Sequence, residues 1–349
     1  EGCLSMSEKA FEVITGGLQT TVQDLGRPGY LSIGMPIAGA QDPFSLRIGN
    51  LLVGNEPGKS FPVIGSPGEA GLAILLLGPT LKVLCSTVVA VTGGDLSCKL
   101  NDKPFPLWTA VRVSEGDVIS FGRPLAGAGA YLCVAGGIQV PPFLGSRSTF
   151  IRGSVGGIEG RALTKGDILK IGIPKLPLEE SVGRTLKPNL IPQYTKKWNI
   201  RVVLGPQDYL FTEESIKLFI TYEWEFSSMS DRMGCRLIGP KLNFKPRPDY
   251  LVDQAGSDPS NIVDDPAPMG GIQVPGGLEP IVLGVEGPSM GGYAKIATVI
   301  TPDISRIGQM KAGDLVKFQA VTVDQAADIL RKTEEILGEH SIIKMTETK

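Results

Sequence analysis

Short apolar runs separated by turn-forming residues dominate the hydrophobic pattern of this 349-residue chain. The runs are rich in β-branched residues and are bounded by Gly, Pro, Asn or Asp, with few helical periods. Such runs predict strands, and their spacing favours hairpins and barrels over alternating strands and helices. The predicted strands are Phe11–Ile14, Thr80–Leu84, Val88–Thr92, Val111–Val113, Ala130–Val134, Ile200–Leu204, Ile281–Val285 and Ala297–Ile300.

Three segments carry the start signals of helices, namely a capping side chain before an apolar period of 3.6 residues. Proline at the first helical position and glycine after the last turn strengthen the first of them. The predicted helices are residues 42–54 with Asp42 as cap, residues 212–222 with Thr212 as cap, and residues 322–337 with Thr322 and Gln325 as a capping box.

A weak internal repeat indicates two related lobes. The sequence Gly-Ile-Gln-Val-Pro occurs at 137–141 and again at 271–275. Between the lobes, a proline-rich stretch without a period predicts an extended linker. We expect an N-terminal extension and first strand at 1–16, a first β-lobe at 17–173, the linker at 174–198, a second β-lobe at 199–320, and a C-terminal helix with a polar tail at 321–349.

The charge balance excludes several classes of partner. The chain has 34 basic and 36 acidic residues, a formal net charge of −2, and its basic residues are scattered. We therefore expect neither nucleic acid nor a membrane as partner, because both attract clustered positive charge. No apolar run approaches the length of a bilayer crossing. The five cysteines are widely spaced and never form Cys-x-x-Cys, which favours a cytoplasmic protein.

Two motifs that suggest familiar chemistry have simpler interpretations. Residues 54–60 resemble a phosphate-binding loop, but the spacing is one residue short and a helix precedes it, so a turn is expected. Residues 287–291 read Gly-Pro-Ser-Met-Gly, yet a strand follows where a nucleophile elbow needs a helix. The only histidine, His340, lies in the predicted tail. We expect no serine triad and no metal site.

Without a usable histidine, proton transfer falls to Asp, Glu, Lys, Tyr or the substrate. Asp24, Asp42 and Asp231 lie in glycine-rich loops and are the candidate catalytic residues. Each also has a purely structural alternative. Asp24 could form a salt bridge with Arg27, Asp42 could cap a helix, and Asp231 could form a turn. Segments 145–149 and 289–293 place hydroxyl groups beside backbone donors, as a carboxylate or oxyanion site requires, although a tight turn has the same composition.

Several segments, in order, resemble one family: residues 20–29, 39–43, 145–150, 205–207, 230–237, 259–262, 271–275 and 287–300. The chain is similar, from about Gly17 to Gln319, to the allophanate hydrolase subunit 2 family. This carboxyltransferase-like domain occurs in urea carboxylase and urea amidolyase, and alone as the C subunit of 5-oxoprolinase. Segments 258–262 and 287–289 resemble the urea carboxylase branch, whereas 292–298 resembles the stand-alone branch, so the substrate stays open.

The resemblance implies a mainly β fold of two related cyclophilin-like β-barrel lobes with a few short helices. It implies transfer of a carboxyl group from carboxybiotin to the nitrogen of a small amide, with biotin and ATP used by partner domains. The expected partners are a subunit 1-like protein, with either a biotin carboxylase and biotin carrier or a LamB/YcsF-like subunit. The alternatives are ATP-dependent opening of 5-oxoproline and a non-catalytic role as a regulatory partner of a kinase-inhibitor-like subunit 1 protein.

The chemistry of carboxyl transfer suggests roles for the candidate residues. We expect one of the three aspartates to position or deprotonate the substrate nitrogen and an arginine to neutralise the transferring carboxylate. The remaining donors would hold the substrate. The substrate-binding candidates are Arg27, Gln41, Arg147, Ser148, Arg232, Ser260, Asn261, Gln273, Ser289, Gly291, Gly292, Tyr293 and Lys295.

Overall fold

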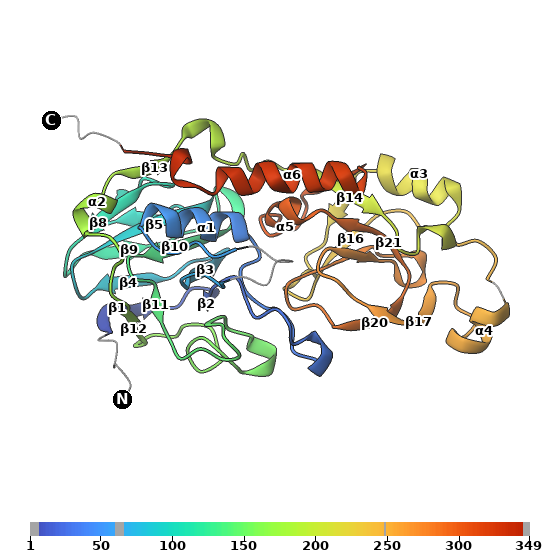
Figure 1. Cartoon of the computed structure of the whole chain (residues 1–349), viewed down its shortest axis with the longest axis horizontal. Coiled ribbons are helices and arrows are strands. Elements are labelled where there is room, and N and C mark those ends of the chain that lie inside the picture. Colours follow the sequence, from blue (N-terminus) through green and yellow to red (C-terminus); the bar gives the residue numbers. More distant parts are fainter. Residues whose placement is uncertain (1–6, 60–65, 248, 345–349) are drawn as a thin grey trace. The chain divides into compact units, whose positions relative to one another are not determined.

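The computed structural model describes residues 7–59, 66–247 and 249–344 and divides the chain into two units (Figure 1). Unit 1 holds the described parts of 1–28, 38–194 and 334–349, and unit 2 holds 29–37 with the described parts of 195–333. Both units are built mainly from strands, so the predicted fold class is confirmed. Every predicted strand lies within or overlaps an observed one.

Unit 1 contains a seven-stranded sheet in the order β11-β12-β1-β4-β9-β6-β7 and a five-stranded sheet in the order β2-β3-β10-β5-β8, all antiparallel. The strands are β1 (Glu8–Thr15), β2 (Gln19–Gln23), β3 (Gly71–Leu75), β4 (Thr80–Val83), β5 (Thr87–Asp95), β6 (Lys99–Leu100), β7 (Lys103–Pro104), β8 (Ala110–Val113), β9 (Val118–Ser120), β10 (Ala126–Val134), β11 (Ile138–Gln139) and β12 (Ile168–Ile171).

Unit 1 has two hydrophobic cores, one on each face of the five-stranded sheet, and β5 contributes side chains to both. Val89 and Val91 belong to the core that side chains of both sheets enclose. Val88 and Ala90 point to the other face, into a second core with helix α1 (Pro43–Leu52). Successive side chains of a strand alternate between faces, so a strand covered on both faces is a continuous apolar run. Asp42 caps α1, as predicted.

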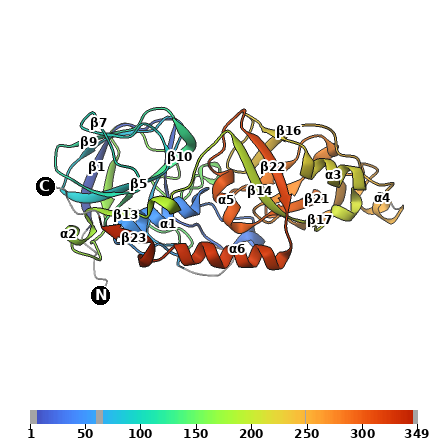
Figure 2. The same ribbon diagram turned by 90° about the horizontal axis from the view of Figure 1, so that it is seen from above.

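Unit 2 is built around a closed barrel in the order β14-β21-β18-β19-β16-β15-β22. Strands β14 and β22 are parallel and run side by side (Figure 2). A separate antiparallel pair, β17 with β20, also belongs to the unit. The strands are β14 (Lys197–Leu204), β15 (Trp224–Phe226), β16 (Gly234–Ile238), β17 (Asn261–Pro266), β18 (Gly271–Gln273), β19 (Ile281–Leu283), β20 (Met290–Tyr293), β21 (Lys295–Val299) and β22 (Leu315–Ala320); the helices are α3 (Glu213–Thr221), α4 (Asp249–Ala255) and α5 (Thr301–Ile307).

The prediction that residues 174–198 form an extended linker is wrong. Residues 174–194 fold as part of unit 1. They form α2 (Leu178–Ser181) and β13 (Arg184–Leu186), and the Leu186 side chain is fully buried. Pro177 and Pro188 lie at the starts of short helical turns, where proline is tolerated. The residues between them are therefore able to form strand hydrogen bonds. Strand β13 pairs with β23 (Ile342–Lys344), so part of the predicted polar tail is also a strand.

The predicted capping box before α6 (Val323–Ile336) is confirmed. The Thr322 backbone N–H donates to Gln325 Oε1 at 2.9 Å, and the Gln325 N–H donates to Thr322 Oγ1 at 3.2 Å. The cap of α3 is confirmed by the bond from the Ser215 N–H to Thr212 Oγ1. None of the helices in the described part of the chain is both long enough and apolar enough to cross a membrane.

Candidate functional site

Asp24 follows β2 in unit 1 and is completely buried. Its Oδ1 accepts hydrogen bonds from the Gly26 N–H at 2.8 Å, Ser146 Oγ at 2.6 Å and Ser148 Oγ at 2.5 Å. Its Oδ2 accepts one from the Arg147 N–H at 2.6 Å. Both oxygens of the Asp24 carboxylate therefore accept hydrogen bonds from the protein itself. These bonds hold the 146–148 loop against the end of β2.

Arg27 lies beneath the same loop. Its guanidinium is 1% exposed and donates to the backbone carbonyls of Ser148 and Phe143. It also lies 5.7 Å from the centre of the Phe143 ring. Gly156 makes room for it: this residue has a φ of +70°, and a Cβ there would be 2.9 Å from an Arg27 nitrogen. The contacts give Arg27 a role in loop architecture.

The other two candidate aspartates also bind their own loops. Asp42 is buried, and its two carboxylate oxygens accept from the Ser45 N–H at 3.0 Å and the Ser45 hydroxyl at 2.6 Å. Asp231 is exposed, and its Oδ1 accepts from the Met233 and Gly234 N–H groups at 2.8 and 3.1 Å. The helix cap and the turn that were their structural alternatives are both present.

Two candidate arginines have carboxylate partners. Arg147 lies 3.8 Å from Glu69. Arg232 Nε donates to Glu286 Oε1 at 2.5 Å, with both side chains almost completely buried. Arg232 thus already has a buried counter-ion in place, whereas Arg147 is partly exposed.

Ser260 organises a turn. Its hydroxyl donates to Asp258 Oδ1 at 2.7 Å and accepts from the Gly276 N–H at 3.0 Å. Bonds from Ser260 lower the pKa of the Asp258 carboxyl below its usual range. The neighbouring Asn261 pairs with Tyr293 across β17 and β20. Gln41, Ser148, Ser289 and Gly292 are buried or partly buried residues of the loops and of strand β20.

Lys295 belongs to unit 2, and its charged side chain is completely buried. Its Nζ lies 2.8 Å from Asp265 Oδ2, and Asp265 is 36% exposed. The same Oδ2 accepts from Gln207 Nε2 at 2.9 Å, while Gln207 Oε1 accepts from the Lys295 backbone N–H at 3.1 Å. The Lys295 ammonium, followed by the Gln207 bond, lowers the pKa of the Asp265 carboxyl.

Gln273 faces Lys295 directly across the β18–β21 ladder. The ladder changes register between Ile272 and Gln273, and the pairing places Gln273 and Lys295 side by side on neighbouring strands. Gln273 is 6% exposed, and its Nε2 makes no hydrogen bond within the described part of the chain. Such a donor needs an acceptor from outside the protein, which a water molecule or a ligand can supply.

Gly291 allows strand β20 to approach this pair. A Cβ at this position would lie 2.4 Å from Gln273 Nε2. Gly291 is also the register partner of Asp265 in β17. We call Gln207, Asp265, Gln273, Gly291 and Lys295 the lysine cluster.

The lysine cluster brings hydrogen-bond donors and an acceptor together. The ammonium and the amide N–H are donors for a carbonyl oxygen, and the ionised carboxylate is an acceptor for an N–H group. Gln273, Gly291 and Lys295 were candidates from the sequence, whereas Gln207 and Asp265 were missed. The 205–207 segment was part of the family resemblance, but it did not reveal that the Gln207 and Asp265 side chains meet.

The family model of the carboxyltransferase domain, subdomain A and B, matches residues 33–320, and the chain belongs to this family. The resemblance inferred from the motifs is thus confirmed. The lysine cluster, at 207–295, lies within the matched segment.

Three relatives show the range of the family. The chain is 37% identical over 330 residues to urea amidolyase of Lachancea kluyveri, covering 92% of this chain and 17% of that protein. It is 33% identical over 331 residues to the C subunit of 5-oxoprolinase from Haemophilus influenzae, covering 92% of this chain and 94% of that one. The crystal structure of Kluyveromyces lactis urea carboxylase has a TM-score of 0.86 at 35% identity, covering 99% of this chain and 30% of that chain. The chain thus spans less than a third of either large enzyme.

The contacts of Asp24 predict a structural role that can be measured. In Asp24→Asn, one carboxylate oxygen becomes an NH₂ group that faces existing donors, so we expect a loss of about 1–3 kcal/mol in unfolding free energy. The matched control is Asp231→Asn, which keeps the accepting oxygen in an exposed turn and should change stability by about 0.5 kcal/mol or less. Urea denaturation measures both, and equal stability of the two variants would contradict the assignment.

The lowered pKa of Asp265 predicts a dependence of stability on pH. A carboxyl group whose folded pKa lies below its unfolded value stabilises the fold above the unfolded pKa, near 4, and this contribution is lost as the pH falls through the folded pKa. Thermal melting of the parent chain and of Lys295→Met between about pH 6 and pH 3 tests this. The difference in melting temperature between the parent chain and Lys295→Met should become smaller as the pH falls. A difference that stays constant with pH would contradict this prediction.

Proposed function

We propose that this chain is the carboxyltransferase component of a biotin-dependent, ATP-driven amide carboxylase of the urea carboxylase type. Membership in the carboxyltransferase family and similarity to urea amidolyase along 92% of the chain support the proposal. The observation that carries it is the buried Gln273 amide donor beside the Lys295 ammonium, because together they provide what a carbonyl oxygen of increasing negative charge needs.

Carboxybiotin, held by a partner domain, would supply the carboxyl group. The chain's own residues would bind and orient the small amide that receives it. Lys295 and Gln273 hold the carbonyl oxygen of the amide. Asp265, kept ionised by Lys295, accepts a hydrogen bond from the N–H group of the attacking nitrogen and orients it.

Gln207 acts as a positioning residue in this proposal. It bonds to the Asp265 carboxylate through Nε2 and to the Lys295 backbone through Oε1, so it fixes the carboxylate relative to the strand that carries the ammonium. Asp24, Asp42 and Asp231 are given no catalytic role, because each accepts backbone hydrogen bonds in its own loop. Arg27, Arg147 and Arg232 are likewise assigned to loop structure.

The proposed partners are a subunit 1-like protein and the biotin carboxylase and biotin carrier domains. We place the complex in the cytoplasm, because the described cysteines Cys85, Cys98, Cys133 and Cys235 are all free thiols.

A second candidate is the role of the C subunit in an ATP-dependent 5-oxoprolinase. The similarity to the C subunit from Haemophilus influenzae, 33% identical over 331 residues, supports it. In this reaction the lactam of 5-oxoproline would occupy the lysine cluster as a planar amide, with its carbonyl oxygen toward Lys295 and Gln273. Biotin would not be needed, and a LamB/YcsF-like subunit would be the partner.

The test is to purify the chain with the proteins encoded beside its gene and to measure substrate-dependent ATP hydrolysis with urea and then with 5-oxoproline. Turnover with urea that requires the biotin carrier supports the carboxylase, and turnover with 5-oxoproline supports the alternative. A stable complex with a subunit 1-like protein but no turnover with either amide would contradict both and leave a regulatory role.

In the active complex, Gln273→Leu and Lys295→Met should each lower kcat by roughly 10²–10³-fold, the usual effect of losing one oxyanion donor. Gln273→Leu should not lower the melting temperature, because the amide donor that it removes has no partner in the described chain. The controls are Gln319→Leu and Lys317→Gln, which change exposed residues of β22. Full activity in the two cluster variants would remove the lysine cluster from the mechanism.

A further inference from the structure

Strand β20 carries two consecutive glycines, Gly291 and Gly292, at its centre. Glycine weakens the interior of a strand, and it often marks a place where another group lies close to the backbone. Neither residue has a positive φ, so the backbone itself does not require glycine at either position. The reason for each glycine therefore lies in its surroundings.

The surroundings of the two glycines differ. A Cβ on Gly292 would lie 3.4 Å from Asp264 Oδ1 and 3.6 Å from the Ile262 carbonyl oxygen, which are ordinary contact distances. A Cβ on Gly291 would lie 2.4 Å from Gln273 Nε2, far inside the optimal separation of about 3.5 Å. Gln273 is 6% exposed, so its amide has little room to move away. Of the two glycines, Gly291 is the one that has to lack a side chain, and the Gln273 amide is the reason.

One rung of the β17–β20 ladder lies against both donors of the proposed amide site. Gly291 lies against Gln273, and its register partner Asp265 lies 2.8 Å from Lys295 Nζ. The ladder changes register between Asn261 and Asp265, an irregularity of the kind that re-aims side chains and is common beside active sites. The amide and the ammonium are therefore both in contact with the Asp265–Gly291 rung.

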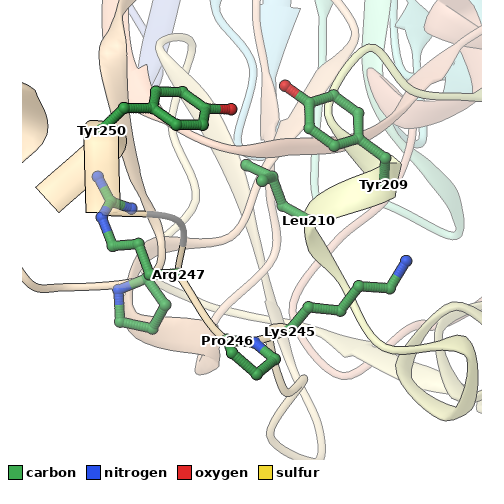
Figure 3. A pocket seen from close by; sticks show the side chains of 7 residues that line it. Tyr209, Leu210, Lys245, Pro246, Arg247 and Tyr250 are labelled. Carbon is green, nitrogen blue, oxygen red and sulfur yellow. The ribbon is translucent and has the colours of Figure 1, made fainter.

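A separate cavity in unit 2 shows no such convergence of donors. It has a volume of about 190 Å³ and shares no residue with the lysine cluster. Its two cationic side chains, Lys245 and Arg247, point to opposite sides of the lining (Figure 3). Arg247 already donates to the Asn261 carbonyl at 2.6 Å. This cavity therefore does not bring donors together in the way that the rung does.

We propose that Gly291 is a positioning residue of the amide site. Because it has no side chain, the Gln273 amide keeps the position from which it donates to the carbonyl oxygen of the substrate. A side chain at this position would push the donor away. The inference rests on the proposed function for the identity of the substrate, but the contact between Gly291 and Gln273 can be measured in the chain alone.

The first test uses the full chain without partners or ATP, so its outcome does not depend on turnover. In nitrogen-15 NMR of the glutamine side chains, Gly291→Ala should move the Gln273 NH₂ signal, because the amide has to give way to the new methyl group. The matched control is Gly292→Ala, which adds the same group one residue further along and should leave that signal in place. An unmoved Gln273 signal in Gly291→Ala would overturn the proposal.

The second test is a double-mutant cycle in the active complex. Gly291→Ala should lower kcat at least about tenfold, a part of the loss expected when the donor is removed altogether. In the Gln273→Leu background it should lower kcat less than about twofold. The reason is that leucine ends at the level of Gln273 Cδ, where a Cβ on Gly291 would have an ordinary contact distance of 3.6 Å. A merely structural role would lower kcat by the same factor in both backgrounds, and equal factors would overturn the proposal.

The double variant also distinguishes a loss of folding from a loss of positioning. If Gly291→Ala lowers the melting temperature, Gln273→Leu should restore it, because the atom that the new methyl group meets is gone. A melting temperature that stays low in the double variant would contradict the assigned contact. Absence of turnover with both amides would contradict the proposed function, and the NMR result would then decide the contact between Gly291 and Gln273 by itself.

Discussion

The contact between Lys295 and Asp265 is the constraint on which the architecture of unit 2 depends. An ammonium group with no exposed surface needs a counter-ion, because an isolated buried charge costs several kcal/mol. Asp265 supplies it at 2.8 Å from a different strand pair, so the ion pair joins the barrel strand β21 to the β17–β20 pair. Gly291 lets β20 lie against Gln273, and Gln207 fixes both members of the ion pair.

Local signals in the sequence predicted local structure well. The caps at Asp42, Thr212 and Thr322 depend on residues within one helical turn, and each cap is present. The uninterrupted apolar run of β5 predicted a strand, although the sequence could not show that its two faces enter different cores. The linker prediction failed because it depended on a high proline content and the absence of a hydrophobic period. Neither property reveals that β13 pairs with the distant strand β23.

The candidate site was predicted only in part, for a related reason. Acidic residues in glycine-rich loops have the same composition whether they bind a substrate or their own backbone, and here Asp24, Asp42 and Asp231 bind backbone. Asp265 was missed because its role follows from the register of β17 with β20, a pairing that no local pattern encodes. Gln273 and Lys295 were candidates through their motifs, but only the β18–β21 ladder shows that they face each other.

The central claim is that the Gln273 amide donates to the carbonyl oxygen of a small amide. Nitrogen-15 NMR of the glutamine side chains, with the Gln273 signal assigned by its absence in Gln273→Leu, measures this donor directly. Addition of the substrate that supports turnover should move the Gln273 NH₂ resonance in a saturable way, while the exposed Gln319 signal stays in place. A stationary Gln273 signal at saturating substrate would contradict the account.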